Sequence, residues 1–286
     1  MSSASISSQT FVLDAGQLGT GEPLYIRGDV RYASEPVEAR PVLIFVHGFK
    51  GFKDWGFFPY MAERFAEQGF YAVTFNFSCN GVRVEDFDEL DRFAHNTYSR
   101  EQQDLALVLQ AINDRSLPAA ERADAGRVYL LGHSRGGGNS IIFAAEHPQI
   151  AGVVTWNGIA RADLFDEAFR AQVAERGVAY VPNARTKQNM PISAAFYEDL
   201  EQNRERYDIV RRLTELRIPV LQVQGDQDAP RLKASFRQLS AAAPQHETVT
   251  IEGGTHTFGA AHPFDATTLQ LEQAVNCTLK FLSRHM

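Results

Sequence analysis

The stretch VYLLGHSRGGGNS, residues 128–140, passes from an apolar run into a glycine-rich turn with a serine, Ser134, at its centre. The apolar run is typical of a buried strand, and the residues that follow, GGNSIIFAAEH (137–147), predict a helix. Gly132 and Gly136 complete the pattern G-x-S-x-G, which presents a serine on a tight strand-to-helix turn. The turn either connects two elements and nothing more, or it presents the Ser134 hydroxyl as a nucleophile. The rest of the chain decides between these readings.

Further short apolar runs, rich in β-branched residues, recur along the chain. Runs of this kind suit interior strands of a parallel sheet, because such strands are buried on both faces. Helical patterns separate them, as in 57–69, 100–114 and 264–284. We therefore expect an α/β fold with a mostly parallel sheet and helices on both faces. The expected strands are PVLIFVHG (41–48), FYAVTFNF (70–77), RVYLLGHS (127–134), IAGVVTWNG (150–158), IPVLQVQG (218–225) and HETVTIEGG (246–254).

Two regions depart from this alternation of strand and helix patterns. LYIRGDVRYA (24–33) alternates between apolar and polar residues, which predicts an exposed antiparallel edge ribbon and hence a mixed sheet. Residues 159–206 form a long, irregular, mainly helical excursion that is rich in aromatic side chains. Long excursions between core strands are usually functional or disordered, and the aromatic residues argue against disorder. We expect an inserted cap at 159–206 and a core made of 1–158 and 207–286.

A nucleophilic serine needs a base and an acid that orients the base. His256 lies in a glycine-rich loop just after the last expected core strand, and it is the favoured base over His262. The acid should follow the preceding strand, where Asp226 and Asp228 are both available, and the spacing favours Asp228. The order Ser134, Asp228, His256 is the order of triad residues in α/β-hydrolases.

Backbone donors for an oxyanion are expected from two loops. The turn after the first core strand places the amide of Phe49 near the serine, and the amide of Arg135 directly follows the nucleophile. Five residues that lie at or just beyond strand ends are candidates for lining a substrate pocket: His47, Trp55, Asn80, His133 and Asn157.

The bulk properties narrow the functional classes. The chain has 286 residues, of which 44% are hydrophobic, which is an ordinary composition for a globular protein. Its formal net charge of −7 gives no attraction to a phosphate backbone, so a nucleic-acid partner is not expected. The two cysteines, Cys79 and Cys277, show no metal-ligand spacing, and no metal site is expected. The start MSSASISSQT lacks the features of a secretory signal, and no run approaches the roughly 18 apolar residues of a membrane span. We expect a cytoplasmic protein without membrane contact.

These motifs resemble the α/β-hydrolase superfamily and, within it, dienelactone hydrolases and cinnamoyl (feruloyl) esterases. The resemblance rests on HGFKG at 47–51, GHSRGG around Ser134, GDQD ending at Asp228 and GTHTF around His256, and it extends from about Leu24 to the C-terminal helix. It implies an eight-stranded sheet, a Ser–Asp–His triad and no cofactor. Dienelactone hydrolases use a cysteine nucleophile, so the serine indicates the esterase side.

The expected function is therefore that of a serine hydrolase, a carboxylesterase that acts on small acyl or aromatic esters through an acyl-enzyme. A thioesterase or acyltransferase would share every motif, and a peptidase on the same triad is a further alternative. A relative that binds ligands without turnover is the alternative from a different class. The expected partner is a small-molecule ester, and assembly as a homodimer is left open.

Overall fold

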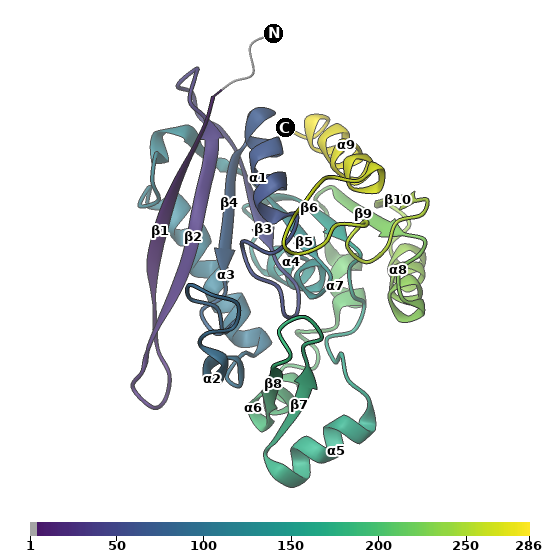
Figure 1. Cartoon of the computed structure of the whole chain (residues 1–286). Helices are drawn as coiled ribbons and strands as arrows, with labels where there is room; N and C mark the ends of the chain where they lie inside the picture. The colour runs from purple at the N-terminus through teal and green to yellow at the C-terminus, as the bar shows by residue number, and fades with distance from the viewer. Residues whose placement is uncertain (1–4) are drawn as a thin grey trace.

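An eight-stranded sheet forms the centre of the computed structural model, which describes residues 5–286 (Figure 1). The strand order is β1-β2-β4-β3-β5-β6-β9-β10; β1 and β2 run antiparallel to their neighbours and the other strands run parallel. The mostly parallel, mixed sheet predicted from the sequence is thus confirmed. Residues 1–4 of the predicted core lie outside the described residues. The strands are β1 (Ile6–Gln17), β2 (Pro23–Ala33), β3 (Arg40–Val46), β4 (Tyr71–Asn76), β5 (Ala123–His133), β6 (Ile150–Trp156), β9 (Val220–Gly225) and β10 (Glu247–Ile251).

Helices cover both faces of the sheet, because the inner strands present apolar side chains on both of their faces. In β3, Val42 and Ile44 pack into one core with α3, α4, α7 and α8, whereas Leu43 and Phe45 pack into a second core with α1 and α9. The helices are α1 (Phe58–Glu67), α2 (Leu90–Phe93), α3 (Tyr98–Asn113), α4 (Arg135–Glu146), α5 (Glu167–Arg176), α6 (Ala194–Gln202), α7 (Ile209–Glu215), α8 (Pro230–Ala242) and α9 (Leu269–Ser283), with a short 3₁₀ turn at Ala120–Arg122.

The prediction of an edge ribbon at residues 24–33 is wrong in one respect. Strand β2 is the second strand of the sheet, and β1 forms the edge. An edge strand buries little of its surface, so β1 can be polar. Its sequence, ISSQTFVLDAGQ, therefore lacks the long apolar run from which the inner strands are predicted. The last helix also begins later than predicted, at Leu269, where the Thr268 hydroxyl caps it by accepting from the Leu271 amide.

The segment between β6 and β9 leaves the sheet and returns to it. It contains α5, an antiparallel hairpin of β7 (Val178–Pro182) and β8 (Asn189–Ser193), and α6. Figure 1 shows these elements gathered beyond one end of the sheet. The mainly helical pattern predicted for residues 159–206 missed the hairpin, whose strands are too short to show a clear period.

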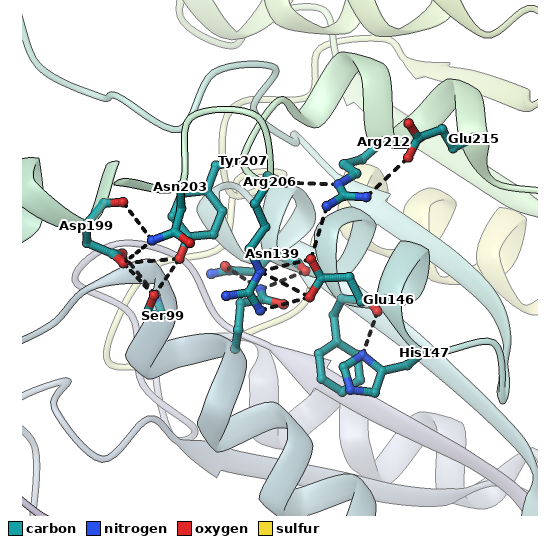
Figure 2. Close-up of polar contacts among 12 residues, drawn as sticks. Ser99, Asn139, Glu146, His147, Asp199, Asn203, Arg206, Tyr207, Arg212 and Glu215 are labelled. Carbon is teal, nitrogen blue, oxygen red and sulfur yellow. Dashed lines mark hydrogen bonds and ion pairs between the residues drawn. The ribbon is translucent and has the colours of Figure 1, made fainter. Parts of the chain in front are cut away.

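Polar contacts, most of them partly buried, attach this inserted segment (residues 159–206) to the helices beside it (Figure 2). Asp199 of α6 accepts a hydrogen bond from the backbone amide of Ser99 at 3.0 Å and contacts the Ser99 hydroxyl. The same carboxylate accepts from Asn203 Nδ2 at 3.0 Å and from Tyr207 Oη at 3.2 Å. A second contact lies at the end of α4, where Glu146 binds Arg206 through two parallel hydrogen bonds. The segment is therefore attached to both α3 and α4.

Candidate active site

Ser134 occupies the sharp turn between β5 and α4. Its backbone has φ 56° and ψ −118°, a conformation that L-residues rarely adopt and that neighbouring structure must hold in place. The Ser134 amide donates to the Trp156 carbonyl at 2.9 Å, and its carbonyl accepts from the amides of Gly137 and Ile159. The turn is thus held from three sides, while the side chain remains partly exposed.

The two glycines of the turn are required by close backbone contacts. A Cβ on Gly132 would lie 2.2 Å from the Gly136 carbonyl oxygen, and a Cβ on Gly136 would lie 2.0 Å from the Val46 carbonyl oxygen. No side chain fits at these distances. The G-x-S-x-G spacing therefore has a steric cause: the elbow packs directly against the end of β3.

Asp228 and His256 form a hydrogen-bonded pair beside the elbow. His256 Nδ1 donates to Asp228 Oδ2 at 2.9 Å, and the carboxylate also accepts from the Ala229 amide and from Gln224 Nε2. Burial alone would raise the pKa of the Asp228 carboxyl, but the hydrogen bond and charge of His256, together with Ala229 and Gln224, hold that pKa below its usual value. Asp228 is therefore suited to fix the imidazole with Nε2 free to accept a proton.

Two buried side chains hold the backbone of the His256 loop. Asn157 Nδ2 and His133 Nε2 each donate to the His256 carbonyl at 2.8 Å. Asn157 Oδ1 also accepts from the Gly225 amide, which ties the His256 loop to the end of β9. Burial and the charge of His256 lower the pKa of His133 to about 3, so His133 is a neutral hydrogen-bond donor here.

The Phe49 and Arg135 amides are both available beside Ser134. A Cβ placed on Gly48 would lie 3.0 Å from Ser134 Cβ and 3.5 Å from the Arg135 nitrogen, so the loop after β3 touches the elbow. Within residues 5–286 neither the Phe49 amide nor the Arg135 amide donates to a protein acceptor. Arg135 begins α4, where unpaired amides and the helix dipole favour negative charge.

Two cavities meet at this point. Ser134, His256, Phe49 and Lys50 line both of them. No hydrogen bond joins the Ser134 and His256 side chains within the described residues; such contacts often tighten only once substrate is bound. The first cavity, of about 320 Å³, is bounded further out by Trp55, Phe58, Arg185 and His262. The second cavity, of about 520 Å³, is bounded further out by Ile159, Arg161, Asp163, Phe165, Val181 and Arg231.

The five predicted pocket residues divide into two groups. Trp55 and His133 line the first cavity. His47, Asn80 and Asn157 are buried and line neither cavity. His47 is buried between the Gly48 carbonyl and the Phe77 amide, and burial lowers its pKa to about 4. Asn80 turns back to accept from the Val82 amide.

The two residues weighed against Asp228 and His256 have other partners. Asp226 Oδ1 accepts from the Gly253 amide at 2.8 Å, which braces the two loops after β9 and β10. His262 Nδ1 accepts from the Gly56 amide at 2.8 Å, and its Nε2 lies 3.5 Å from Asp86 Oδ2. His262 lines the first cavity, but its partners are not those of a base oriented by Asp228.

The Arg135 side chain points away from both cavities. It is fully buried, donates from Nε to Glu101 Oε2 at 3.0 Å, and lies over the Tyr98 ring at 4.1 Å. The ring of Phe196, on α6, is 5.4 Å away. The side chain therefore braces the start of α4 against α3 and α6.

Sequence reasoning missed Gln224 and Arg231. Gln224 supports the Asp228 carboxylate from inside β9. A buried glutamine needs a hydrogen-bond partner, so the two glutamines of this strand, Gln222 and Gln224, are the signal that could have found it. Arg231 lies three residues beyond Asp228, and nothing in its local sequence points to a cavity.

Between residues 5 and 286 no group of three or more His, Cys, Asp and Glu side chains is arranged to hold a metal ion. In the same range no helix has the length and apolar character needed to cross a membrane.

The sheet order, the serine on its strand-to-helix turn and the acid–histidine pair after later strands define the α/β-hydrolase class. The chain belongs to the alpha/beta hydrolase family, whose model matches residues 43–268. A comparison with curated protein sequences finds no match.

Solved structures share the fold over nearly the whole chain. Est1E from Butyrivibrio proteoclasticus, solved with ferulic acid bound, superposes with a TM-score of 0.70 at 18% identity, covering 96% of this chain and 98% of Est1E. The alpha/beta hydrolase GrgF from a Penicillium species has a TM-score of 0.72 at 17% identity over 97% and 99% of the two chains. A dienelactone hydrolase from Anabaena variabilis has a TM-score of 0.61 at 15% identity over 98% and 99%. At these identities the likeness establishes the fold.

Proposed function

We propose that this hydrolase is a serine carboxylesterase that cleaves small esters through an acyl-enzyme formed on Ser134. The observation that carries the proposal is the meeting of three features at one cavity wall. These are a serine on a strained turn, a histidine bonded to a buried carboxylate, and two backbone amides without protein acceptors. Each corresponds to one need of ester hydrolysis: a nucleophile, a base and stabilisation of developing charge.

In the proposed first half-reaction, Ser134 Oγ attacks the ester carbonyl carbon as His256 Nε2 accepts the hydroxyl proton. Asp228 keeps the imidazole in the required tautomer and stabilises the imidazolium. The Phe49 and Arg135 amides donate to the oxyanion. The bond from the carbonyl carbon to the alcohol oxygen then breaks, and His256 returns its proton to the departing alcohol.

Water repeats the sequence on the acyl-enzyme. His256 accepts a proton from water as the oxygen attacks the acyl carbon, and the bond to Ser134 Oγ breaks with return of that proton to the serine. The products are an alcohol and a carboxylic acid. The chemistry uses residues of this chain and water alone.

We also propose that the inserted segment acts as a cap. It contributes Asn183 and Arg185 to the first cavity and Arg161, Phe165 and Val181 to the second. A segment that lines both cavities can select substrates by shape and charge.

The proposal is tested by steady-state hydrolysis of p-nitrophenyl esters of rising chain length and of hydroxycinnamate methyl esters. Ser134→Ala should lower kcat by roughly 10⁴-fold or more, because it removes the nucleophile. An unimpaired variant would refute the proposal. Adding a small alcohol or thiol to the assay measures transfer of the acyl group to an acceptor other than water. Transfer that outpaces hydrolysis would favour the acyltransferase alternative.

A further inference from the structure

The second cavity has an unusual charge composition. Lys50, Arg161 and Arg231 line it from the loop after β3, the inserted segment and the start of α8. Asp163 is the carboxylate in its lining, and Asp163 Oδ1 already accepts from the Phe165 amide at 3.1 Å. Cations therefore exceed carboxylates in this cavity, on a chain whose formal net charge is −7.

These cations lack anionic partners. Lys50 Nζ donates to the Pro182 carbonyl at 3.3 Å, and Arg231 Nη1 donates to the Leu164 carbonyl at 3.1 Å. Across residues 5–286 no carboxylate lies within 4.0 Å of Lys50, Arg161 or Arg231 as an ion pair. The two carbonyls use one donor of Lys50 and one donor of Arg231 and leave the other donors of both groups available to a ligand.

The first cavity shares Lys50 with the second but differs in the pairing of its arginine. Its arginine, Arg185, forms an ion pair with Asp86. Aromatic side chains form one part of its outer wall, where the Trp55 ring stacks on His262 at 5.9 Å between centroids and Phe58 lies nearby in the lining. The two cavities therefore offer different chemistry on either side of the reacting groups.

Lys50 and Arg231 also influence one another. Burial and the charge of Arg231 lower the pKa of the Lys50 ammonium. An anion bound beside both cations would reduce this repulsion and gain charge-assisted hydrogen bonds from both.

We infer that the second cavity is a carboxylate subsite, so that the preferred ester carries a carboxylate on one side of the scissile bond. Because Lys50 lines both cavities beside Phe49 and Ser134, a carboxylate bound there would be part of the molecule that Ser134 attacks. The aromatic first cavity would take the other, apolar side of the ester. The inference rests on the proposed esterase function and names its substrate class.

The test compares esters that differ in charge but hardly in shape. 4-Acetoxybenzoate and 4-acetoxybenzamide place the group on the alcohol side, and monomethyl terephthalate and methyl 4-carbamoylbenzoate place it on the acyl side. For each pair the quantity is kcat/KM for the carboxylate divided by kcat/KM for the carboxamide. The variants are Lys50→Met and Arg231→Gln. Arg237→Gln is the matched control, since Arg237 is exposed on the same helix and lines neither cavity.

We expect the ratio for one pair to fall about 10-fold in Lys50→Met and in Arg231→Gln and to stay at the wild-type value in Arg237→Gln. The pair that responds identifies the side of the ester that enters the second cavity. Ser134-dependent hydrolysis with ratios that none of the variants changes would overturn this inference and leave the esterase intact. Hydrolysis of none of the four esters above the Ser134→Ala background would overturn both.

Discussion

At Ser134 the backbone adopts φ 56° and ψ −118°, a strained conformation of the kind that costs on the order of 1–3 kcal/mol and persists only when its surroundings enforce it. The hydrogen bond from the Ser134 amide to the Trp156 carbonyl holds this conformation in place, and Gly132 and Gly136 allow the close backbone contacts around it. The strain projects the hydroxyl from the sheet edge into the space shared by the two cavities. The G-x-S-x-G motif is thus explained by a steric requirement of the folded turn.

The acid of the proposed triad can be tested by a matched pair of substitutions. Asp228→Asn should lower kcat for a model ester by roughly 10³–10⁴-fold, because an amide cannot hold the required imidazole tautomer or stabilise its charge. Asp226→Asn should remain close to wild type, since Asp226 braces two loops and does not contact His256. Steady-state kinetics decide the matter, and equal losses in the two variants would contradict the assignment.

The positions of residues were predictable where the strand order determines them. Ser134, Asp228 and His256 each follow a strand of the parallel sheet, so their convergence at one sheet edge could be expected. The direction in which a side chain turns could not be predicted in this way. Asn157 also follows a strand, but its amide turns inward to hold the His256 loop. The charge of the second cavity could not be predicted, because Lys50, Arg161 and Arg231 come from separate segments of the chain.

At the scale of elements, one buried carboxylate lies at the centre of the polar contacts between the inserted segment and α3. Asp199 accepts from the Ser99 amide, Asn203 and Tyr207, so it joins the start of α3 to α6 and to the turn before α7 (Figure 2). Removing a buried charge with several donors leaves those donors unsatisfied. We therefore regard Asp199 as the anchor of the segment.

Asp199→Ala should weaken the anchor by about 2–4 kcal/mol. Hydrogen exchange of amides in 194–207 should then become roughly 30-fold faster or more, with little change in β5 and β9. Glu201→Gln is the control, because Glu201 is an exposed residue of the same helix whose ion pair with Arg170 is also exposed. Equal acceleration throughout the sheet, or none beyond the control, would contradict the anchoring role.

The elements of the core were more predictable than those of the inserted segment. Apolar runs located the parallel strands to within a few residues, because burial on both faces demands such runs. The strands β7 and β8 of the hairpin are only five residues long, and their burial patterns show no regular alternation, so they could not be predicted from periodicity. Strand β1 was not predicted because it lies at the edge of the sheet, where a strand does not need a continuous apolar run.

For the whole molecule, two buried neutral imidazoles make stability sensitive to acid. Burial lowers the pKa of His47 to about 4, and burial with the charge of His256 lowers that of His133 to about 3. Unfolded histidine titrates near about 6.5, so below that pH the unfolded chain binds protons that the folded chain does not. The stabilising contribution is complete above about pH 6.5 and declines as the pH falls towards 4.

Urea unfolding at pH 7 and pH 5 checks this expectation. Each buried histidine should cost about 2 kcal/mol of unfolding free energy between these values. His47→Gln, which removes one titrating group, should therefore lose about 2 kcal/mol less than wild type. His95→Gln, at an exposed position, should lose as much as wild type. If His47→Gln and wild type lose the same amount, His47 is not held neutral by the fold.

The central claim is that Ser134 is the nucleophile, and active-site labelling with a fluorophosphonate tests it most directly. The intact mass of wild-type protein should rise by one phosphonyl group, and peptide mapping should place that group on Ser134. Ser134→Ala should stay unlabelled, and Asp228→Asn should label far more slowly. An unlabelled folded wild type, or a label on another residue with Ser134→Ala still reactive, would contradict the account.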